Sequence, residues 1–148
     1  MKEPLLSREE FKEIYSKVPR LCVEVVIKTH GGVVLGLRKL PSWQGMWHFP
    51  GGALDYNETI AEAVERIAKD EIGVSVTMDK LLGYIEYPSE KKERGFGWSV
   101  SLAILCRPES EEFRPDNFNS SEIKVFSELP ENMVVEQKEF LIKEKVLQ

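Results

Sequence analysis

A tight glycine turn that opens into a short acidic helix constrains this chain more than any other feature. The turn is Pro50-Gly51-Gly52. Thr59 followed by Glu62 forms a capping box, which predicts that a helix begins there, and Gly73 provides the left-handed residue that ends it. The sequence therefore predicts a loop that leads into a helix of about three turns.

The predicted helix has one apolar face, and acidic residues lie around the rest of its surface. The apolar residues recur at helical spacing, so one face is expected to pack against a sheet. They are Ile60, Ala63, Val64 and Ile67, and the acids in and before the helix are Glu58, Glu62, Glu65, Asp70 and Glu71. Acids on a helix usually form a solvated face, which is the alternative to a functional site.

Asp70 and Glu71 fall on the last turn, where the negative end of the helix dipole disfavours carboxylates. A cation is therefore expected to offset them. Arg66 can bridge to Glu62 or to Asp70 at four-residue spacing. The other candidate is Mg2+, which binds one or two carboxylates, waters and phosphate oxygens, and the carbonyl of Gly51 is a further ligand for it.

The spacing from Gly52 to Val74 resembles the Nudix box, Gx5Ex7REUxEExGU, in which U is an aliphatic residue. The matching residues are Gly52, Glu58, Arg66, Glu71, Gly73 and Val74, with Asp70 in place of a Glu and Ala68 at the first U. Ile67 departs from the pattern, because it occupies the position of a Glu that normally faces the metals. The chain thus carries a two-carboxylate version of the motif.

The resemblance implies a hydrolase that uses Mg2+, with Mn2+ as an alternative, on a small nucleotide substrate. It assigns the metal to Gly51, Asp70 and Glu71, and the catalytic residues to Asp70, Glu71, Arg66 and a base outside the motif. It assigns structural roles to Gly52, Glu58, Arg66 and Gly73. It also makes a homodimer a reasonable expectation.

Over most of the first 75 residues the chain is similar to the GDP-mannose mannosyl hydrolases, a Nudix subgroup whose box also lacks that Glu. The shared features include an acid early in the first strand, Glu24, and the spacing from Arg38 to the Pro-Gly-Gly turn. Those enzymes use one metal and attack the anomeric carbon of the sugar. Ala53 replaces an Arg of that subgroup, and the segment 119–121 lacks its catalytic His. We therefore carry over the fold and the single metal, but not the mannosyl specificity.

Three further residues are candidates for contact with the substrate, and a fourth is the candidate catalytic base. Arg38 ends a predicted strand and can form a forked contact with a diphosphate, as an Arg at this place often does in the Nudix family. Trp43 is favoured over Trp47 as a ligand contact, and Glu24 is expected to bind substrate. Neither His30 nor His48 is well placed as a base, so we assign the catalytic base to Glu122, which directly precedes the last predicted strand.

Composition fits one domain, residues 1–148, because 148 residues with 42% hydrophobic content can bury a single core. The net charge of −5 argues against nucleic-acid binding. Cys22 and Cys106 are expected to be buried reduced thiols, which favours a cytoplasmic protein. The charged N-terminus is unlike a signal peptide, and the absence of an apolar run of about 18 residues argues against a membrane protein.

Strands flanked by helices predict an α/β fold, a mixed β-sheet covered on both faces in the Nudix-like alpha/beta/alpha sandwich. The predicted helices are 8–15, 60–72 and 135–146, and the predicted strands are 21–28, 33–38, 47–49, 80–87, 98–106 and 123–126. The segments 88–97 and 107–121 are predicted loops that can shape a site. In the first loop, Lys91, Lys92 and Arg94 can meet phosphates, although a solvated charge run is the simpler interpretation.

Three functions follow from these observations. The leading hypothesis is a Mg2+-dependent nucleotide or nucleotide-sugar pyrophosphohydrolase. The second keeps a nucleotide-sugar substrate and moves the attack to the anomeric carbon. The third is a nucleotide-binding module that does not hydrolyse its ligand.

Overall fold

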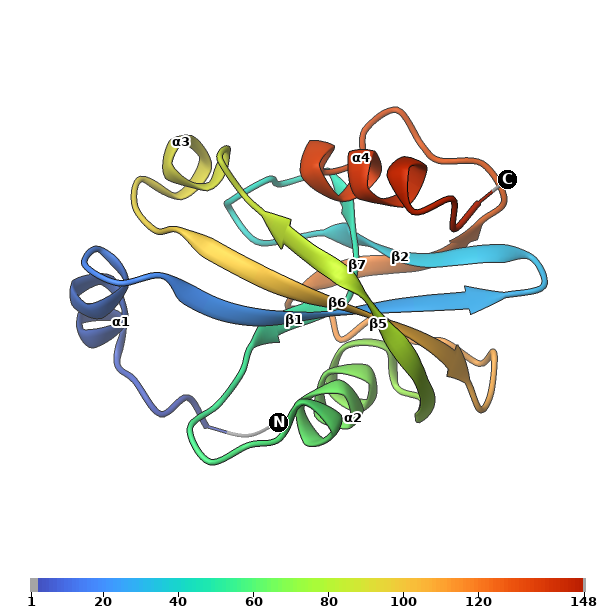
Figure 1. Cartoon of the computed structure of the whole chain (residues 1–148), viewed down its shortest axis with the longest axis horizontal. Coiled ribbons are helices and arrows are strands. Elements are labelled where there is room, and N and C mark those ends of the chain that lie inside the picture. The colour runs from blue at the N-terminus through green and yellow to red at the C-terminus, as the bar shows by residue number, and fades with distance from the viewer. Residues whose placement is uncertain (1–2, 148) are drawn as a thin grey trace.

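The protein folds into a mixed sheet with helices on both faces (Figure 1). The computed structural model describes residues 3–147. Its strands are β1 (Arg20–Thr29), β2 (Gly32–Arg38), β3 (Trp47–His48), β4 (Gly51–Ala53), β5 (Val76–Glu86), β6 (Ser99–Pro108) and β7 (Ser120–Phe126). Its helices are α1 (Arg8–Tyr15), α2 (Ile60–Ile72), α3 (Glu90–Arg94) and α4 (Val135–Lys143).

Strand β1 is the centre of the sheet. The strand order is β3-β2-β1-β6-β5, with β4 also paired to β1 and β7 paired to β2. The pairing of β1 with β6 is parallel, and β1 pairs with β2 and β4 in the antiparallel sense. The sheet is therefore mixed, as predicted, and β1 borders the strand β4 that leads toward α2.

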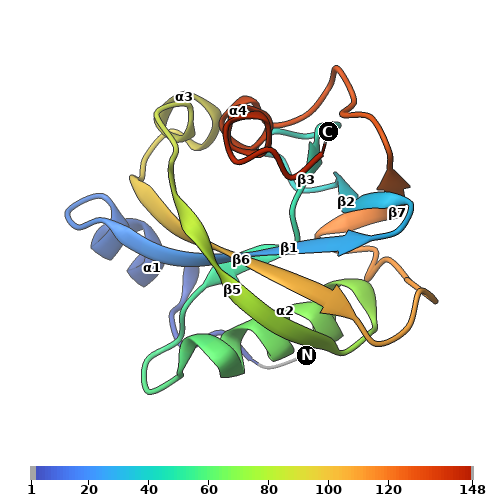
Figure 2. The ribbon, with the colours of Figure 1, turned by 45° about the vertical axis from the view of Figure 1, so that its right-hand side comes forward.

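Two apolar cores lie on the two faces of the sheet. Figures 1 and 2 show α2 on one face and α4 on the other. Alternate residues of β1, including Val23 and Val25, pack with α2. Val26, on the opposite face, packs with Phe140 and Leu141 of α4. Glu24 lies on this second face, where a polar group requires partners.

The helix predictions are confirmed at the level of their caps. Both capping boxes are formed, one by Ser7 with Glu10 and the other by Thr59 with Glu62. Gly73 ends α2 with a φ of 75°, which is the left-handed conformation that favours glycine. None of the helices within residues 3–147 combines the length and apolarity needed to cross a bilayer.

Four elements differ from the sequence-based expectation. The sequence predicts only a turn at Gly51-Gly52, but both residues belong to β4, which pairs with β1. The predicted loop 88–97 contains α3, a single short helix without apolar periodicity. Strand β5 begins at Val76 rather than at residue 80, and β7 begins at Ser120 rather than at residue 123. The register between β2 and β7 shifts between Leu37 and Arg38.

Candidate functional site

A cavity of about 480 Å³ opens beside the point where β4 meets β1. Side chains from both ends of the chain reach it, because α1, α3 and α4 all contribute to its wall. The residues that the following argument uses are Glu24, Arg38, Trp43, Gly51, Tyr87 and Ser101. A volume of this size suits a small-molecule ligand.

Gly51 joins this cavity to helix α2. The amide of Val25 donates to the carbonyl of Pro50, and the amide of Leu54 donates to the carbonyl of Leu21. Backbone groups alternate in direction along an antiparallel pair, so the amide and carbonyl of Gly51 point away from β1. The Gly51 amide lies 3.4 Å from the Oε1 atom of Glu71, so the Gly51 carbonyl faces the same edge. A Cβ atom at Gly51 would lie 2.0 Å from the Oε2 atom of Glu24. Only glycine therefore fits between these two carboxyl groups.

Arg66 fixes the loop that precedes α2. Its Nε lies 2.7 Å from Oε2 of Glu58, and its Nη2 donates to Oε1 of Glu58 at 2.9 Å and to the Ala53 carbonyl at 3.1 Å. Glu58 also accepts a hydrogen bond from the Asp55 amide at 3.0 Å. The guanidinium thus connects β4, the loop and the helix, which fits the structural role expected for Glu58 and Arg66.

The suggested bridges from Arg66 to Glu62 or Asp70 are wrong. The carboxylate of Glu62 is used in the capping box, where it accepts from the Thr59 amide at 2.9 Å. Arg66 instead turns toward Glu58, where a forked contact with two oxygens is available. Within residues 3–147, the side chain of Asp70 receives no hydrogen bond or ion pair. The charge of Asp70 still acts on Arg66, because it contributes to the raised pKa of this guanidinium.

Glu71 is a buried carboxyl group on the last turn of α2. It is 8% exposed, and burial is the main reason that its pKa lies well above the usual value. Asp70 and Glu71 together line a second cavity of about 170 Å³, with Asp55 and Asn119 among its other walls. A carboxylate so placed requires a positive partner to remain charged.

These donors fit a hard divalent cation. The Gly51 carbonyl, Asp70 and Glu71 are all oxygen ligands, and Mg2+ completes such a set with water. Within the described part of the chain, no three His, Cys, Asp or Glu side chains form a ligand cluster. Ile67 explains the missing third carboxylate, because it is 1% exposed and packs in the core between α2 and the sheet. Ile67 therefore offers no carboxylate at the position where the motif has a Glu.

Glu24 occupies the wall of the larger cavity. Its Oε1 atom accepts hydrogen bonds from the hydroxyl of Tyr87 at 3.0 Å and from that of Ser101 at 2.9 Å. Burial raises its pKa to about 7, although these two hydroxyl groups oppose the shift. The sequence indicated Glu24 itself, as an acid in an apolar strand, but its partners lie on β6 and just beyond β5 and became visible only with the strand register.

Arg38 and Trp43 lie together on the cavity wall. Arg38 donates from Nε to the Ser42 carbonyl and from Nη2 to the Ser42 hydroxyl at 2.8 Å, and its guanidinium lies 5.4 Å from the Trp43 ring centroid. The Trp43 indole donates to Ser89 at 3.1 Å. Trp47, by contrast, packs in the core against Phe126. The two predicted contact residues are thus brought to the same cavity.

Glu122 lies outside this arrangement. It is an exposed residue of β7 opposite Leu37, and it does not belong to the wall of either cavity described above. Asp116, another acid of the same loop, is occupied by hydrogen bonds from Phe118, Asn119 and Ser120. Neither Asp116 nor Glu122 lines the two cavities, but the charge of Asp116 contributes to the raised pKa of Glu71.

His48 is also unsuited to accept a proton. It is buried, and its Nε2 atom lies 3.1 Å from the hydroxyl of Ser120. Burial and the nearby guanidinium of Arg38 lower the pKa of His48 to about 3. Its proton affinity is therefore weak at neutral pH, in agreement with the sequence-based expectation.

Comparison with known proteins identifies relatives of this architecture. A family model described as NUDIX domain matches residues 18–147. A MutT NUDIX hydrolase from Burkholderia pseudomallei has a similar structure, with a TM-score of 0.76 and 23% identity over 85% of this chain and 98% of that chain. At this identity the likeness supports the fold.

Two curated relatives resemble part of the sequence. The low-salt glycan biosynthesis protein Agl8 of Haloferax volcanii is 40% identical over 79 residues, which are 53% of this chain and 51% of that protein. The 8-oxo-dGTP diphosphatase of Proteus vulgaris is 39% identical over 64 residues, 43% of this chain and 57% of that protein. The matches thus span little more than half the length of these relatives.

Proposed function

The chain belongs to the Nudix family, and on this basis we propose that it is a divalent-metal-dependent hydrolase of a nucleoside diphosphate linked to another group. The observation that carries the proposal is the approach of the buried Glu71 carboxyl group to the Gly51 amide, beside a ligand-sized cavity that Gly51 lines and a smaller one that Asp70 and Glu71 line. The name of the Proteus vulgaris relative, a nucleotide diphosphatase, supports this substrate class.

We assign the metal to the carbonyl of Gly51 and to the carboxylates of Asp70 and Glu71. A bound Mg2+ or Mn2+ would supply positive charge to the diphosphate and polarise it. Arg38 is positioned to hold diphosphate oxygens through its guanidinium, and Trp43 can contact the adjoining base or sugar. Glu58 and Arg66 keep the loop before α2 in place.

We propose Glu24 as the catalytic base in place of Glu122. Its Oε1 atom is held by Tyr87 and Ser101, which leaves Oε2, the atom beside Gly51, to accept a proton from the attacking water. A carboxyl group with a pKa near 7 is well matched to this task at neutral pH. The exposed position of Glu122 does not offer such contact.

A substrate screen tests the proposed activity. Nucleoside triphosphates, nucleotide sugars and dinucleoside polyphosphates are incubated with the protein and Mg2+ or Mn2+, and the products are separated by chromatography. We expect turnover of at least one nucleoside diphosphate derivative and its loss after chelation with EDTA. Binding without turnover across the screen would contradict this activity and favour a nucleotide-binding module.

The buried position of Ile67 favours a second candidate function. A site with two carboxylates suits one cation that neutralises a departing diphosphate, so attack at the anomeric carbon of a nucleotide sugar is the alternative. The name of the Haloferax volcanii relative, a glycan biosynthesis protein, is compatible with such a substrate. Hydrolysis in oxygen-18 water separates the two reactions, because label enters phosphate in the first and the sugar in the second.

We further propose a cytoplasmic homodimer. Both cysteines are buried free thiols, which suits a reducing compartment.

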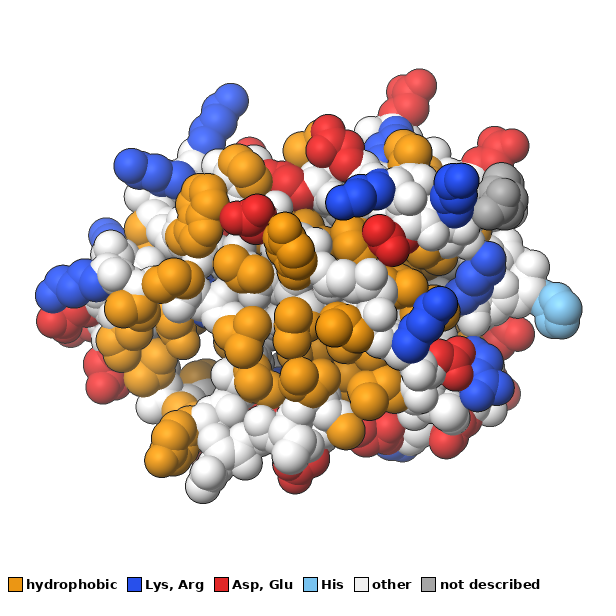
Figure 3. Space-filling model, in the orientation of Figure 1, with side chains coloured by type: hydrophobic (Ala, Val, Ile, Leu, Met, Phe, Trp, Pro, Cys, Tyr) orange, Lys and Arg blue, Asp and Glu red, His pale blue; other side chains and the backbone are white. Residues whose placement is uncertain are grey.

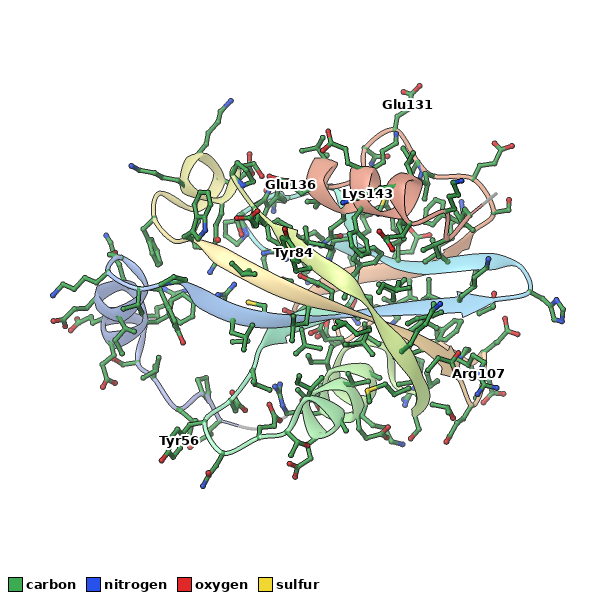
Figure 4. All side chains as sticks on the ribbon, in the orientation of Figure 1. Tyr56, Tyr84, Arg107, Glu131, Glu136 and Lys143 are labelled. Carbon is green, nitrogen blue, oxygen red and sulfur yellow. The ribbon has the colours of Figure 1, made fainter. Side chains whose placement is uncertain are left out.

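Apolar side chains gather over the middle of the molecular face in Figure 3, where β5 forms the last strand of the sheet path. Leu81 and Tyr84 of β5 are 58% and 64% exposed, and Figure 4 shows Tyr84 on this face. An open apolar edge strand of this kind suits pairing with a second copy.

A further inference from the structure

Four arginines line the larger cavity, more than a diphosphate contact by Arg38 requires. The other three are Arg8 on α1, Arg20 at the start of β1 and Arg94 at the end of α3. They come from the side of the cavity that α1 and α3 cover, and Figure 2 shows both helices at the same end of the sheet. We call these three residues the arginine subsite.

Aromatic packing holds two members of the arginine subsite in place. The guanidinium carbon of Arg20 lies 5.2 Å from the centroid of the Phe11 ring, and that of Arg94 lies 5.8 Å from the same centroid. The edges of Tyr15 and Phe96 fix this ring in turn. Arg20 also donates to the hydroxyl of Ser99 at 3.3 Å. The guanidinium groups are thus oriented before any ligand binds.

The nearby acids do not satisfy these guanidinium groups. The buried Nε atom of Arg94 lies 3.5 Å from the Oε2 atom of Glu90 as an ion pair, but it makes no hydrogen bond within residues 3–147. Glu90 directs its other oxygen to the amide of Ser99 at 2.7 Å. Arg8 is exposed and makes no side-chain hydrogen bond or ion pair within the same residues. Glu90 is thus the acid that lines the cavity beside three guanidinium groups, and this excess of positive charge favours a bound anion.

Burial and mutual repulsion lower the pKa values of two arginines of the cavity. Burial and the charge of Arg20 lower the pKa of Arg94, and burial and the charge of Arg94 lower the pKa of Arg38. The guanidinium groups thus act on one another across the cavity, while Glu24 opposes the shift of Arg38 and Glu90 that of Arg94. Phe11 is already in contact with two guanidinium groups, so its ring is less suited to stacking on a nucleobase.

We propose that the arginine subsite binds a second anionic group, a phosphate or a carboxylate, carried by the substrate moiety beyond the diphosphate. This inference rests on the proposed hydrolase function and narrows its substrates to nucleoside diphosphate derivatives with a charged second half. Guanidinium groups form short, forked hydrogen bonds with either group. The diphosphate then occupies the Gly51 and Arg38 end of the cavity.

Two matched ligand pairs test the proposal. The first is UDP-glucose with UDP-glucuronate, which differ by a carboxylate, and the second is ADP-ribose with ADP-ribose 5-phosphate, which differ by a phosphate on the terminal ribose. Binding is measured by calorimetry in EDTA, so that the ligands stay intact. We expect the charged member of at least one pair to bind about 10-fold or more tightly than the neutral member. The pair that shows this preference identifies the anion.

Variants assign the preference to the arginine subsite. Arg20→Gln and Arg94→Gln should each reduce it to about 3-fold or less, while the neutral ligand binds as before. Arg94→Lys should retain part of it, and Arg107→Gln, at an exposed position paired with Asp79, is the matched control. Equal binding of both members in both pairs, no binding, or an undiminished preference in the Gln variants would overturn the proposal.

Failure of this inference differs from failure of the hydrolase function. Turnover of neutral and charged substrates at equal efficiency would remove the anion preference and leave the hydrolase function intact. A preference for the charged ligand without any turnover would support the arginine subsite and contradict the hydrolase function. The calorimetric measurement therefore decides the inference in either case.

Discussion

At the scale of single residues, Glu24 and Glu71 are two carboxyl groups whose charge the fold strongly affects. Both are buried carboxyl groups that approach Gly51, one over the face of the sheet and the other from the open edge of β4. Burial raises both pKa values, because the charged form loses its hydration. Gly51 thus lies between the two carboxyl groups to which we assign the base and a metal ligand.

Glu24 gives a prediction for the pH dependence of the reaction. A base must be deprotonated to act, so kcat/KM should fall as the pH drops below the pKa of Glu24, which is about 7 in the metal-free protein. A cation bound nearby lowers this value, so the acidic limb should lie at or below pH 7. Glu24→Gln should lose the limb and about 100-fold or more of kcat/KM. An unchanged profile in Glu24→Gln would contradict the assignment.

The raised pKa of Glu24 should also make the stability of the protein depend on pH. The folded-state pKa of Glu24, about 7, lies above its ordinary value of 4.5, so between these values the folded state holds a proton that the unfolded chain releases. Stability should therefore decline as the pH rises through this window, by about 2 to 3 kcal/mol from this residue. Urea unfolding at pH 5 and pH 8 in EDTA measures it. Glu24→Gln should show a smaller decline, and an equal decline would exclude Glu24 as its source.

At the scale of elements, the loop and helix α2 act as one unit through Glu58 and Arg66. Glu58→Ala should leave Arg66 half-buried without its forked partner, which costs about 1 to 3 kcal/mol of stability. We also expect weaker metal binding, because the loop positions Gly51. Urea unfolding and Mn2+ titration measure the two effects. Glu13→Ala removes an exposed ion pair on α1 and is the control. Equal effects of the two substitutions would argue against this role.

The elements also show how far sequence reasoning extends. The caps of α1 and α2 were predictable, because each depends on residues three positions apart. The ion pair between Arg66 and Glu58 could not be predicted from helical spacing, because Glu58 lies before the helix and reaches Arg66 only after the loop folds back. The exposed position of Glu122 was not predictable for a similar reason, since the neighbours of its strand depend on long-range register.

At the scale of the whole molecule, the cavity is assembled from segments distant in sequence. Arg8 on α1, Glu24 on β1 and Gln137 on α4 all reach its wall. Such a cavity cannot be predicted from local spacing, whereas the approach of Glu71 to Gly51 could be, because both residues belong to one continuous motif. The sequence thus indicated the Gly51 and Glu71 end of the candidate site more completely than the end that Arg8 and Gln137 line.

The apolar face around β5 gives a prediction about assembly. Leu81→Lys places a charge in the middle of the exposed edge strand and should shift the protein from dimer to monomer. Light scattering after size-exclusion chromatography measures the mass of each form. Val18→Lys, at an exposed position near α1, should leave the mass unchanged. A wild-type protein that is monomeric throughout the accessible concentration range would exclude the proposed dimer.

The central claim is that Glu71 belongs to a metal site that drives hydrolysis. The most direct measurement compares Mg2+-dependent turnover of the best substrate in Glu71→Gln and Glu65→Gln, two equivalent changes on the same helix. Glu65 bonds to Ser75 and does not line either cavity, so its variant should keep nearly full activity. Glu71→Gln should lose about 100-fold or more of kcat and most of its response to Mg2+. Turnover and Mg2+ dependence that survive Glu71→Gln would contradict the claim.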